Sequence, residues 1–230
     1  MKEDFLDRKL QERSDAGALR VLRIGDDRAD YYSNDYLGIS KNGLIEAFFP
    51  HTRLAHGSTG SRLLAGNYPL IEETEKEIAA FHDAEAALIF NSGYDANFGL
   101  LACIAGKGDL ILYDKLSHAS LRDGIRQSLA DSFSFAHNDR GDLEKKLKNK
   151  KGNCFVVTES VFSMDGDMAP LADMVALCRQ FNAHLVVDEA HATGFVGARG
   201  EGLVQDLNLQ DDCFARIHTC LLYTSPSPRD

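Results

Sequence analysis

Short apolar runs alternate with amphipathic segments along most of the chain. An apolar run bounded by turn residues is typical of a buried strand, and apolar residues at spacings of three and four are typical of a helix. Strands that alternate with helices of this length predict an α/β fold with a mostly parallel sheet and helices on both of its faces. The predicted strands are 86–90, 110–113, 154–158, 184–187 and 214–217, and the predicted helices are 1–15, 43–49, 69–81, 95–104, 119–130, 142–150 and 171–181, with a hairpin over 20–33.

Composition narrows the class of protein. The 230 residues carry a net charge of −10, which argues against a protein that must hold the phosphate backbone of a nucleic acid. No apolar run approaches the roughly 18 residues needed to cross a bilayer, and the charged start of the chain resembles no secretory signal. The five cysteines are scattered and odd in number, which favours reduced thiols. We therefore expect a cytoplasmic protein with no nucleic-acid partner and no membrane association.

The segment HLVVDEAHATG places an acid and an imidazole, Asp188 and His191, just after an apolar run. Ligands of open α/β sheets gather at the carboxyl ends of such strands. One interpretation is the magnesium-binding DEAH box of a helicase, which also requires a glycine-rich phosphate loop upstream. The nearest candidate, Gly106–Gly108, lacks the earlier glycine and a hydroxyl residue after its lysine. We therefore favour the other interpretation, an acid that pairs with the ring nitrogen of pyridoxal phosphate.

Two more segments that follow predicted strands contain candidate site residues. In FNSGYDAN, Gly93 and Tyr94 open a predicted helix, whose N–H groups and dipole suit a phosphate, although an ordinary strand-to-helix turn has the same pattern. In YDKLSHAS, Ser117 could cap a helix and leave His118 exposed. Alternatively, the flat ring of His118 could lie against a cofactor ring. Neither segment decides between its alternatives alone.

The loop ESVFSMDGDMAP follows the apolar run CFVVT. Its cluster Asp165–Asp167 is not a calcium loop, because Ala169 and Pro170 stand where a further ligand and a turn glycine are needed. The loop could simply cap the next helix, or Glu159 and Ser163 could face the same crevice as the acid of the DEAH segment. The remaining histidines show no close ligand pairing, so we expect no metal site.

Six motifs, taken in order, resemble those of one enzyme family. They are SNDYLG (33–38), HGSTGSRLLAGN (56–67), FNSGYDAN (90–97), DKLSHAS (114–120), TESVFSMDGDMAPL (158–171) and VVDEAHATGFVG (186–197). On these motifs the chain is identified as a member of the α-oxoamine synthases. The resemblance implies a pyridoxal 5'-phosphate enzyme with the large domain of the aspartate-aminotransferase fold, fold type I.

The resemblance also implies a reaction and an assembly. Enzymes of this family condense an amino acid with an acyl thioester, with loss of CO2, and work as homodimers with active sites at the subunit interface. Within the family the likeness is greatest to the enzyme of biotin biosynthesis, which joins L-alanine to a pimeloyl group carried on coenzyme A or an acyl carrier protein. Relatives that use glycine or serine are the alternative.

Each site residue takes a role from this resemblance. The catalytic residues implied are His118, Asp188 and His191: Asp188 keeps the ring nitrogen protonated, while His118 stacks on the ring. His191 and Ser163 hydrogen-bond the region of the phenolic oxygen, and Arg20, together with His118, meets the substrate. The cofactor-binding residues implied are Gly93, Tyr94, His118, Glu159, Ser163, Asp188, His191 and Thr219.

The end of the chain departs from the family. In these enzymes the strand matching 214–219 leads to a turn with the lysine that binds the cofactor covalently, but here that position falls on Leu222. No lysine occurs after Lys151. We therefore expect a catalytically inactive fragment, incomplete at its C-terminus. The expected segments are an N-terminal helix and hairpin (1–40), a partial cofactor-binding large domain (41–219) and a foreign tail (220–230), with no C-terminal small domain.

Overall fold

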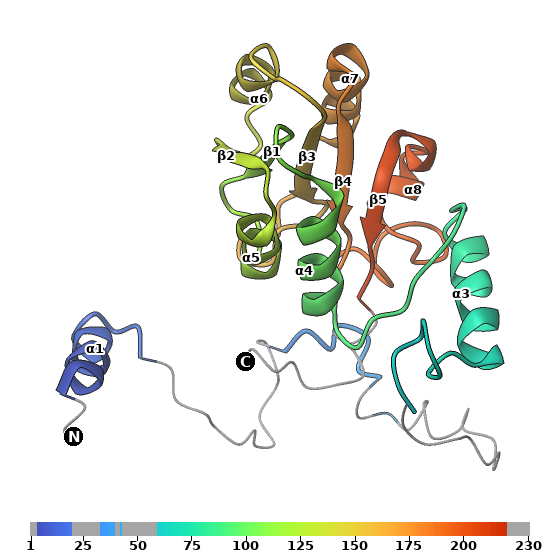
Figure 1. Cartoon of the computed structure of the whole chain (residues 1–230), viewed down its shortest axis with the longest axis horizontal. Coiled ribbons are helices and arrows are strands. Elements are labelled where there is room, and N and C mark those ends of the chain that lie inside the picture. Colours follow the sequence, from blue (N-terminus) through green and yellow to red (C-terminus); the bar gives the residue numbers. More distant parts are fainter. Residues whose placement is uncertain (1–3, 20–32, 40–41, 43–58, 220–230) are drawn as a thin grey trace. The chain divides into compact units, whose positions relative to one another are not determined.

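A computed structural model describes residues 4–19, 33–39, 42 and 59–219 (Figure 1). The chain divides into two compact units, residues 1–33 and 34–230. In the first unit, helix α1 (Asp4–Asp15) confirms the predicted charged helix, and its side chains from Phe5 onward are exposed. The sheet and the other helices described below all belong to the second unit.

The second unit is built on one parallel sheet of five strands, in the order β2-β1-β3-β4-β5. Every neighbouring pair is parallel, which confirms the predicted fold class. The central strand β3 is buried at all six positions, as expected for a parallel strand covered on both faces. The strands are β1 (Leu110–Asp114), β2 (Asp131–Phe135), β3 (Cys154–Glu159), β4 (His184–Asp188) and β5 (Cys213–Ile217).

Helices cover both faces of the sheet through two separate apolar clusters. On one face Leu143 of α6 and Met174 of α7 pack on the strands, and on the other face Leu101 of α4 and Leu121 of α5 do so. The helices of this unit, labelled in Figure 1, are α3 (Pro69–Phe81), α4 (Gly93–Ile104), α5 (Ala119–Gln127), α6 (Arg140–Leu147), α7 (Leu171–Phe181) and the short α8 (Leu203–Asp206), with a 3-10 turn at Gln210–Asp212.

Local signals explain where these helices begin and end. Helix α4 begins after Ser92, whose hydroxyl accepts a hydrogen bond from the Asp95 N–H at 3.0 Å. Helix α3 begins with a proline at its first position, which loses no intrahelical bond there. Helix α7 ends at Asn182, which takes the left-handed backbone conformation that asparagine tolerates.

Two predicted strands differ from the structure. Segment 86–90 is not a strand, because no strand of the described residues pairs with it, and Leu88 is 70% exposed. Strand β2 was not predicted, because it lies at the sheet edge and four of its five residues are exposed, so its sequence shows little hydrophobicity. The predicted helix at 43–49 and the hairpin over 20–33, apart from Ser33, lie outside the described residues.

Candidate active site

Asp188 ends β4 at the carboxyl edge of the sheet, where its side chain is 4% exposed. Its Oδ2 accepts a hydrogen bond from Asn97 Nδ2 at 2.7 Å, and its Oδ1 accepts one from the Ala190 N–H at 2.9 Å. Burial raises the pKa of Asp188, while these two hydrogen bonds oppose that shift. Within the described residues no cationic side chain pairs with this carboxylate, so the site holds a buried acid that suits a cationic group.

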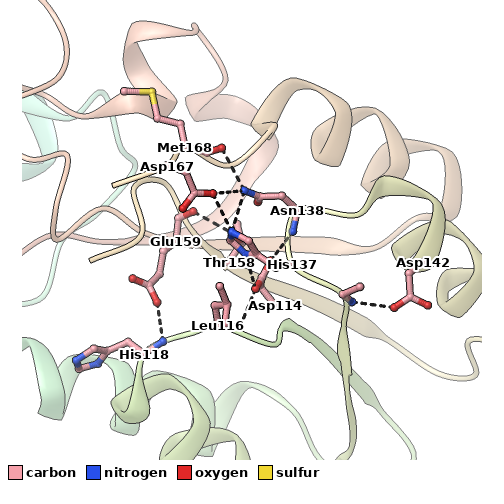
Figure 2. Close-up of polar contacts among 11 residues, drawn as sticks. Asp114, Leu116, His118, His137, Asn138, Asp142, Thr158, Glu159, Asp167 and Met168 are labelled. Atoms are coloured by element: carbon pink, nitrogen blue, oxygen red, sulfur yellow. Dashed lines mark hydrogen bonds and ion pairs between the residues drawn. The ribbon is translucent and has the colours of Figure 1, made fainter. Parts of the chain in front are cut away.

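His118 and Glu159 lie next to Asp188 on the neighbouring elements. Glu159 ends β3, directly opposite Asp188 in the register of the sheet, and its Oε1 accepts a hydrogen bond from the His118 N–H at 2.6 Å (Figure 2). His118 itself is the N-cap of α5, and its ring Nδ1 accepts from the Ser120 N–H. The interpretation of Ser117 as the cap is therefore wrong, and the Ser117 hydroxyl is buried with no partner among the described atoms.

His191 follows β4 and meets the SNDYLG segment. Its ring Nδ1 lies 3.0 Å from the Tyr36 hydroxyl, with the two ring centroids 6.2 Å apart. Burial lowers the pKa of His191 and raises the pKa of Tyr36, so both groups are uncharged near neutral pH. The structure thus places a neutral imidazole, paired with a phenol, three residues beyond the buried acid.

The N-terminus of α4 meets the end of β5. A Cβ atom added at Gly93 would lie 2.5 Å from Thr219 Oγ1, so no larger residue fits without movement of Thr219. The first N–H groups of a helix have no acceptor within the helix, and together with a nearby hydroxyl they suit an anionic group such as phosphate. The Tyr94 side chain points elsewhere, because its hydroxyl donates to Asp123 Oδ2 at 2.8 Å.

The structure does not bring all the predicted site residues together. Ser163 is exposed in a turn after β3, and within the described residues its hydroxyl makes no hydrogen bond to the other candidates. Arg20 lies outside the described residues. Conversely, sequence reasoning did not single out Asn97, Ser120 and Tyr36, which contact the buried acid and the two histidines. In the sequence, a polar residue such as Asn97, one turn inside an apolar helix, indicates a buried polar contact.

A second polar cluster lies beside the site (Figure 2). His137 lies between two carboxylates, with Nδ1 3.0 Å from Asp114 Oδ1 and Nε2 2.8 Å from Asp167 Oδ2. Asn138 binds the same two acids, through its backbone N–H to Asp114 and through its side chain to Asp167. Because Asp167 belongs to the loop after β3, the cluster ties that loop to the ends of β1 and β2.

The part of the chain that the structure describes contains neither a candidate membrane span nor a candidate metal centre. No helix there is both long and apolar enough to cross a membrane. In the same ranges, no group of three or more His, Cys, Asp or Glu side chains is placed to hold a metal ion.

Comparison with known proteins identifies the class of protein. Residues 30–224 match the family described as aminotransferase class I and II, so the chain belongs to that family. Within it, the resemblance to the α-oxoamine synthases is confirmed. The chain is 42% identical over 215 residues to a putative 8-amino-7-oxononanoate synthase of Bacillus licheniformis, covering 91% of this chain and 57% of that protein. It is 45% identical to a protein of the same name in Geobacillus kaustophilus, covering 87% of this chain and 52% of that one.

Solved structures agree with this assignment. A serine palmitoyltransferase from S. paucimobilis superposes with a TM-score of 0.81 at 30% identity, covering 98% of this chain and 65% of that one. The 8-amino-7-oxononanoate synthase of Francisella tularensis superposes with a TM-score of 0.60 at 28% identity, covering 80% of this chain and 52% of that one. The chain spans about half the length of the curated relatives that it matches.

Proposed function

We propose that this chain forms the cofactor-binding part of a pyridoxal-phosphate-dependent 8-amino-7-oxononanoate synthase. The reaction joins L-alanine to a pimeloyl thioester and releases CO2 and the thiol carrier. The observation that carries the proposal is the buried Asp188 carboxylate at the carboxyl edge of the sheet, with two neutral donors and no cation paired to it among the described residues. The identity of 42–45% to proteins named for this activity supports the choice of reaction.

The residues at this edge fit pyridoxal phosphate. When bound, this cofactor supplies a ring that accepts electrons from the carbanion formed at the α-carbon of the amino acid. Asp188 would hold the proton on the ring nitrogen, since an opposite charge favours the charged form of both groups. At 4 Å and an intermediate dielectric, such a pair is worth about 4 kcal/mol. The N-terminus of α4, with Gly93 beside Thr219, would receive the phosphate.

The remaining residues take the following roles in the proposal. His118 would pack against the cofactor ring and help to place the substrate, while Glu159 fixes the backbone of His118 by its hydrogen bond. His191, whose Nδ1 lies 3.0 Å from the Tyr36 hydroxyl, would face the phenolic oxygen of the cofactor. The roles of Ser163 at the same oxygen, of the Tyr94 N–H at the phosphate and of Arg20 at the acyl substrate rest on the family resemblance alone.

We further propose that the amino acid substrate is L-alanine rather than glycine or serine. Serine palmitoyltransferases share the fold, which makes a glycine- or serine-using synthase the alternative. A pocket discriminates one methyl group by only about 1–3 kcal/mol, so small changes in lining residues separate these enzymes. The identity of 42–45% to curated relatives named putative 8-amino-7-oxononanoate synthase supports alanine.

The proposal includes an assembly and a location. We infer a homodimer from the family resemblance, with coenzyme A or an acyl carrier protein as the carrier of the pimeloyl group. We infer a cytoplasmic location because the four cysteines of the described ranges are free thiols.

Release of CO2 from alanine, glycine and serine, each with a pimeloyl thioester, tests the proposed reaction. The first sample is the 230-residue chain, and the second joins residues 1–219 to the C-terminal half of the Geobacillus kaustophilus relative. We expect no turnover from the first, because efficient proton transfer and exchange of the amino acid need a lysine that no position after Lys151 supplies. From the second we expect turnover with alanine at least about tenfold above glycine or serine.

The intact Geobacillus kaustophilus protein is the control for the joined protein. Turnover by the 230-residue chain would contradict the expected inactivity. A joined protein that prefers glycine or serine would contradict the choice of alanine.

A further inference from the structure

Two buried polar side chains connect the acid and the imidazole of the site. Asn97 Nδ2 donates to Asp188 Oδ2 at 2.7 Å and to Ser120 Oγ at 3.0 Å, and Ser120 Oγ lies 2.5 Å from His118 Nδ1. Asn97 is 3% exposed and Ser120 is 0% exposed. We propose that Asn97 and Ser120 are positioning residues that fix the Asp188 carboxylate and the His118 ring relative to each other. For its catalytic meaning, this inference rests on the proposed function.

The chemistry of the end groups fixes the direction of each hydrogen bond. Asn97 Nδ2 lies within hydrogen-bond distance of both Asp188 Oδ2 and Ser120 Oγ, and an amide NH2 group has one proton for each of these acceptors. A rotated amide would instead place its oxygen against the carboxylate. The second amide proton then goes to Ser120 Oγ, which leaves the Ser120 hydroxyl proton to donate to His118 Nδ1.

A backbone hydrogen bond also indicates that His118 Nδ1 is an acceptor. The Ser120 N–H also points at His118 Nδ1, at 3.3 Å, and a backbone N–H can only donate. Two donors therefore converge on Nδ1, so the neutral ring carries its proton on Nε2. In histidine sites the hydrogen bond at one ring nitrogen decides the state of the other in this way.

The packing of α4 on α5 holds this hydrogen-bond chain in place. Asn97 lies on α4 and Ser120 lies on α5. The two helices approach so closely that a Cβ at Gly124 would lie 2.9 Å from Phe98 Cα and 3.0 Å from the Asn97 carbonyl oxygen. With the backbones fixed at this distance, the side chains have little freedom to change partners.

The chain of hydrogen bonds has a defined task in the proposed reaction. Neither Asn97 nor Ser120 touches the reacting atoms. Asn97 holds one carboxylate oxygen of Asp188 and the Ala190 N–H holds the other, which sets the plane of the carboxylate. Ser120 sets the rotation and tautomer of the His118 ring through both its hydroxyl and its backbone N–H. The site is thus organised before a cofactor binds, which lowers the cost of binding it.

NMR of the 230-residue chain tests the inference without the cofactor. Long-range proton–nitrogen spectra at about pH 8, where an ordinary histidine is neutral, distinguish protonated from unprotonated ring nitrogens. Comparison with His118→Gln identifies the signals of this ring. The test variants are Ser120→Ala and Asn97→Leu. Ser128→Ala is the matched control, since Ser128 is the C-cap residue at the far end of the same helix and its hydroxyl donates to the Ile125 carbonyl.

We expect unprotonated Nδ1 and protonated Nε2 in the parent chain. In Ser120→Ala the Nδ1 signal should move away from its parent position, because the hydroxyl donor is lost and only the backbone N–H of residue 120 still donates to Nδ1. In Asn97→Leu the Nδ1 signal should move less, because the Ser120 hydroxyl keeps its bond to the ring but loses the Asn97 donor that orients it. The dissociation constant for pyridoxal phosphate, measured by its absorbance, should rise about tenfold, a change that corresponds to about 1.4 kcal/mol. Ser128→Ala should change neither quantity.

A protonated Nδ1 in the parent chain would overturn the inference, whatever the variants do. Unchanged nitrogen signals in both test variants would also overturn it. If the signals move while the dissociation constant does not, the hydrogen bonds are structural only and the positioning role is wrong. A parent chain that binds no pyridoxal phosphate contradicts the proposed function, while the nitrogen signals still decide the hydrogen-bond chain.

Discussion

At the scale of single residues, the pKa values of the buried Asp188 and the half-buried His137 are shifted by different dominant causes. Asp188 receives hydrogen bonds from neutral donors only, so burial dominates and raises its pKa. For His137, burial lowers the pKa, but hydrogen bonds to Asp114 and Asp167 outweigh burial and raise it. Asp188 has no cationic partner among the described residues and can accept one from a ligand. His137 already has two carboxylate partners, Asp114 and Asp167. This contrast separates a candidate site from a structural ion pair.

The structural role of His137 predicts a pH-dependent loss of stability. A histidine with a raised folded-state pKa stabilises the fold below its unfolded pKa of about 6.5, and this contribution is lost as the pH rises through the folded value. We expect His137→Gln to lower the free energy of unfolding by about 2 kcal/mol at about pH 5.5 and by less at about pH 8.5. Urea unfolding at the two pH values measures this difference.

Asp167→Asn provides the companion variant. It removes one of the two charged acceptors of His137 and should therefore show a smaller loss with the same dependence on pH. A loss for His137→Gln that is equal at both pH values would show that its charge does not contribute to stability.

Sequence reasoning located the residues at strand ends better than those inside helices. Asp188, Glu159 and Gly93 follow or end apolar runs, where ligands of α/β sheets gather, so position alone indicated them. Asn97 and Ser120 lie within helices, and only the packing of α4 on α5 turns them towards the site. The polar Asn97 in an apolar helix was a local signal of a buried polar contact, but the sequence did not show which residues it contacts.

At the scale of elements, the contact between α4 and α5 supports the site. Both helices pack on the same face of the sheet, and Leu101, Leu121 and Ile125 fill the space beneath them. Gly124 permits the close approach because it has no side chain. A Cβ atom at this position would clash with backbone atoms of α4. The two helices could not approach this closely if residue 124 had a side chain.

This close approach predicts the effect of a single methyl group. We expect Gly124→Ala to destabilise the chain by about 1–3 kcal/mol, because the added Cβ meets backbone atoms that cannot move alone. Gly99→Ala is the matched control on α4, where the nearest atom is Phe90 Cε1 at 3.5 Å. There the better helix propensity of alanine should leave stability unchanged or raise it by up to about 1 kcal/mol.

Urea unfolding of both variants measures the two effects. Equal stabilities for Gly124→Ala and Gly99→Ala would mean that the helix contact yields easily, and that it does not fix the positions of Asn97 and Ser120.

The differences between predicted and observed elements have a common physical cause. Segment 86–90 is apolar but has no strand beside it among the described residues, and strand β2 pairs at the edge although its sequence is polar. Segment 86–90 is largely exposed despite its apolar sequence, with Leu88 70% and Phe90 44% exposed. A strand exists only where a partner offers backbone hydrogen bonds, and the sequence of one segment does not show whether such a partner is present. The central strands, which are both buried and paired, could be predicted almost to the residue.

At the scale of the whole molecule, the parallel sheet collects the candidate residues at one edge. Glu159, Asp188 and Ile217 are in register on adjacent strands, and the turns that follow them supply His191 and Thr219. Such an edge is the usual place for ligands of open α/β sheets. The chain spans about half the length of its curated relatives. Experiments on the chain therefore test the part of the site that this sheet edge forms.

A crystal structure of the 230-residue chain with pyridoxal phosphate tests the central claim most directly. The account predicts the ring nitrogen about 2.8 Å from a carboxylate oxygen of Asp188, the distance of a charge-assisted hydrogen bond. The phosphate should lie at the N-terminus of α4. A ring bound elsewhere, or an Asp188 carboxylate turned away from the ring nitrogen, would contradict the account.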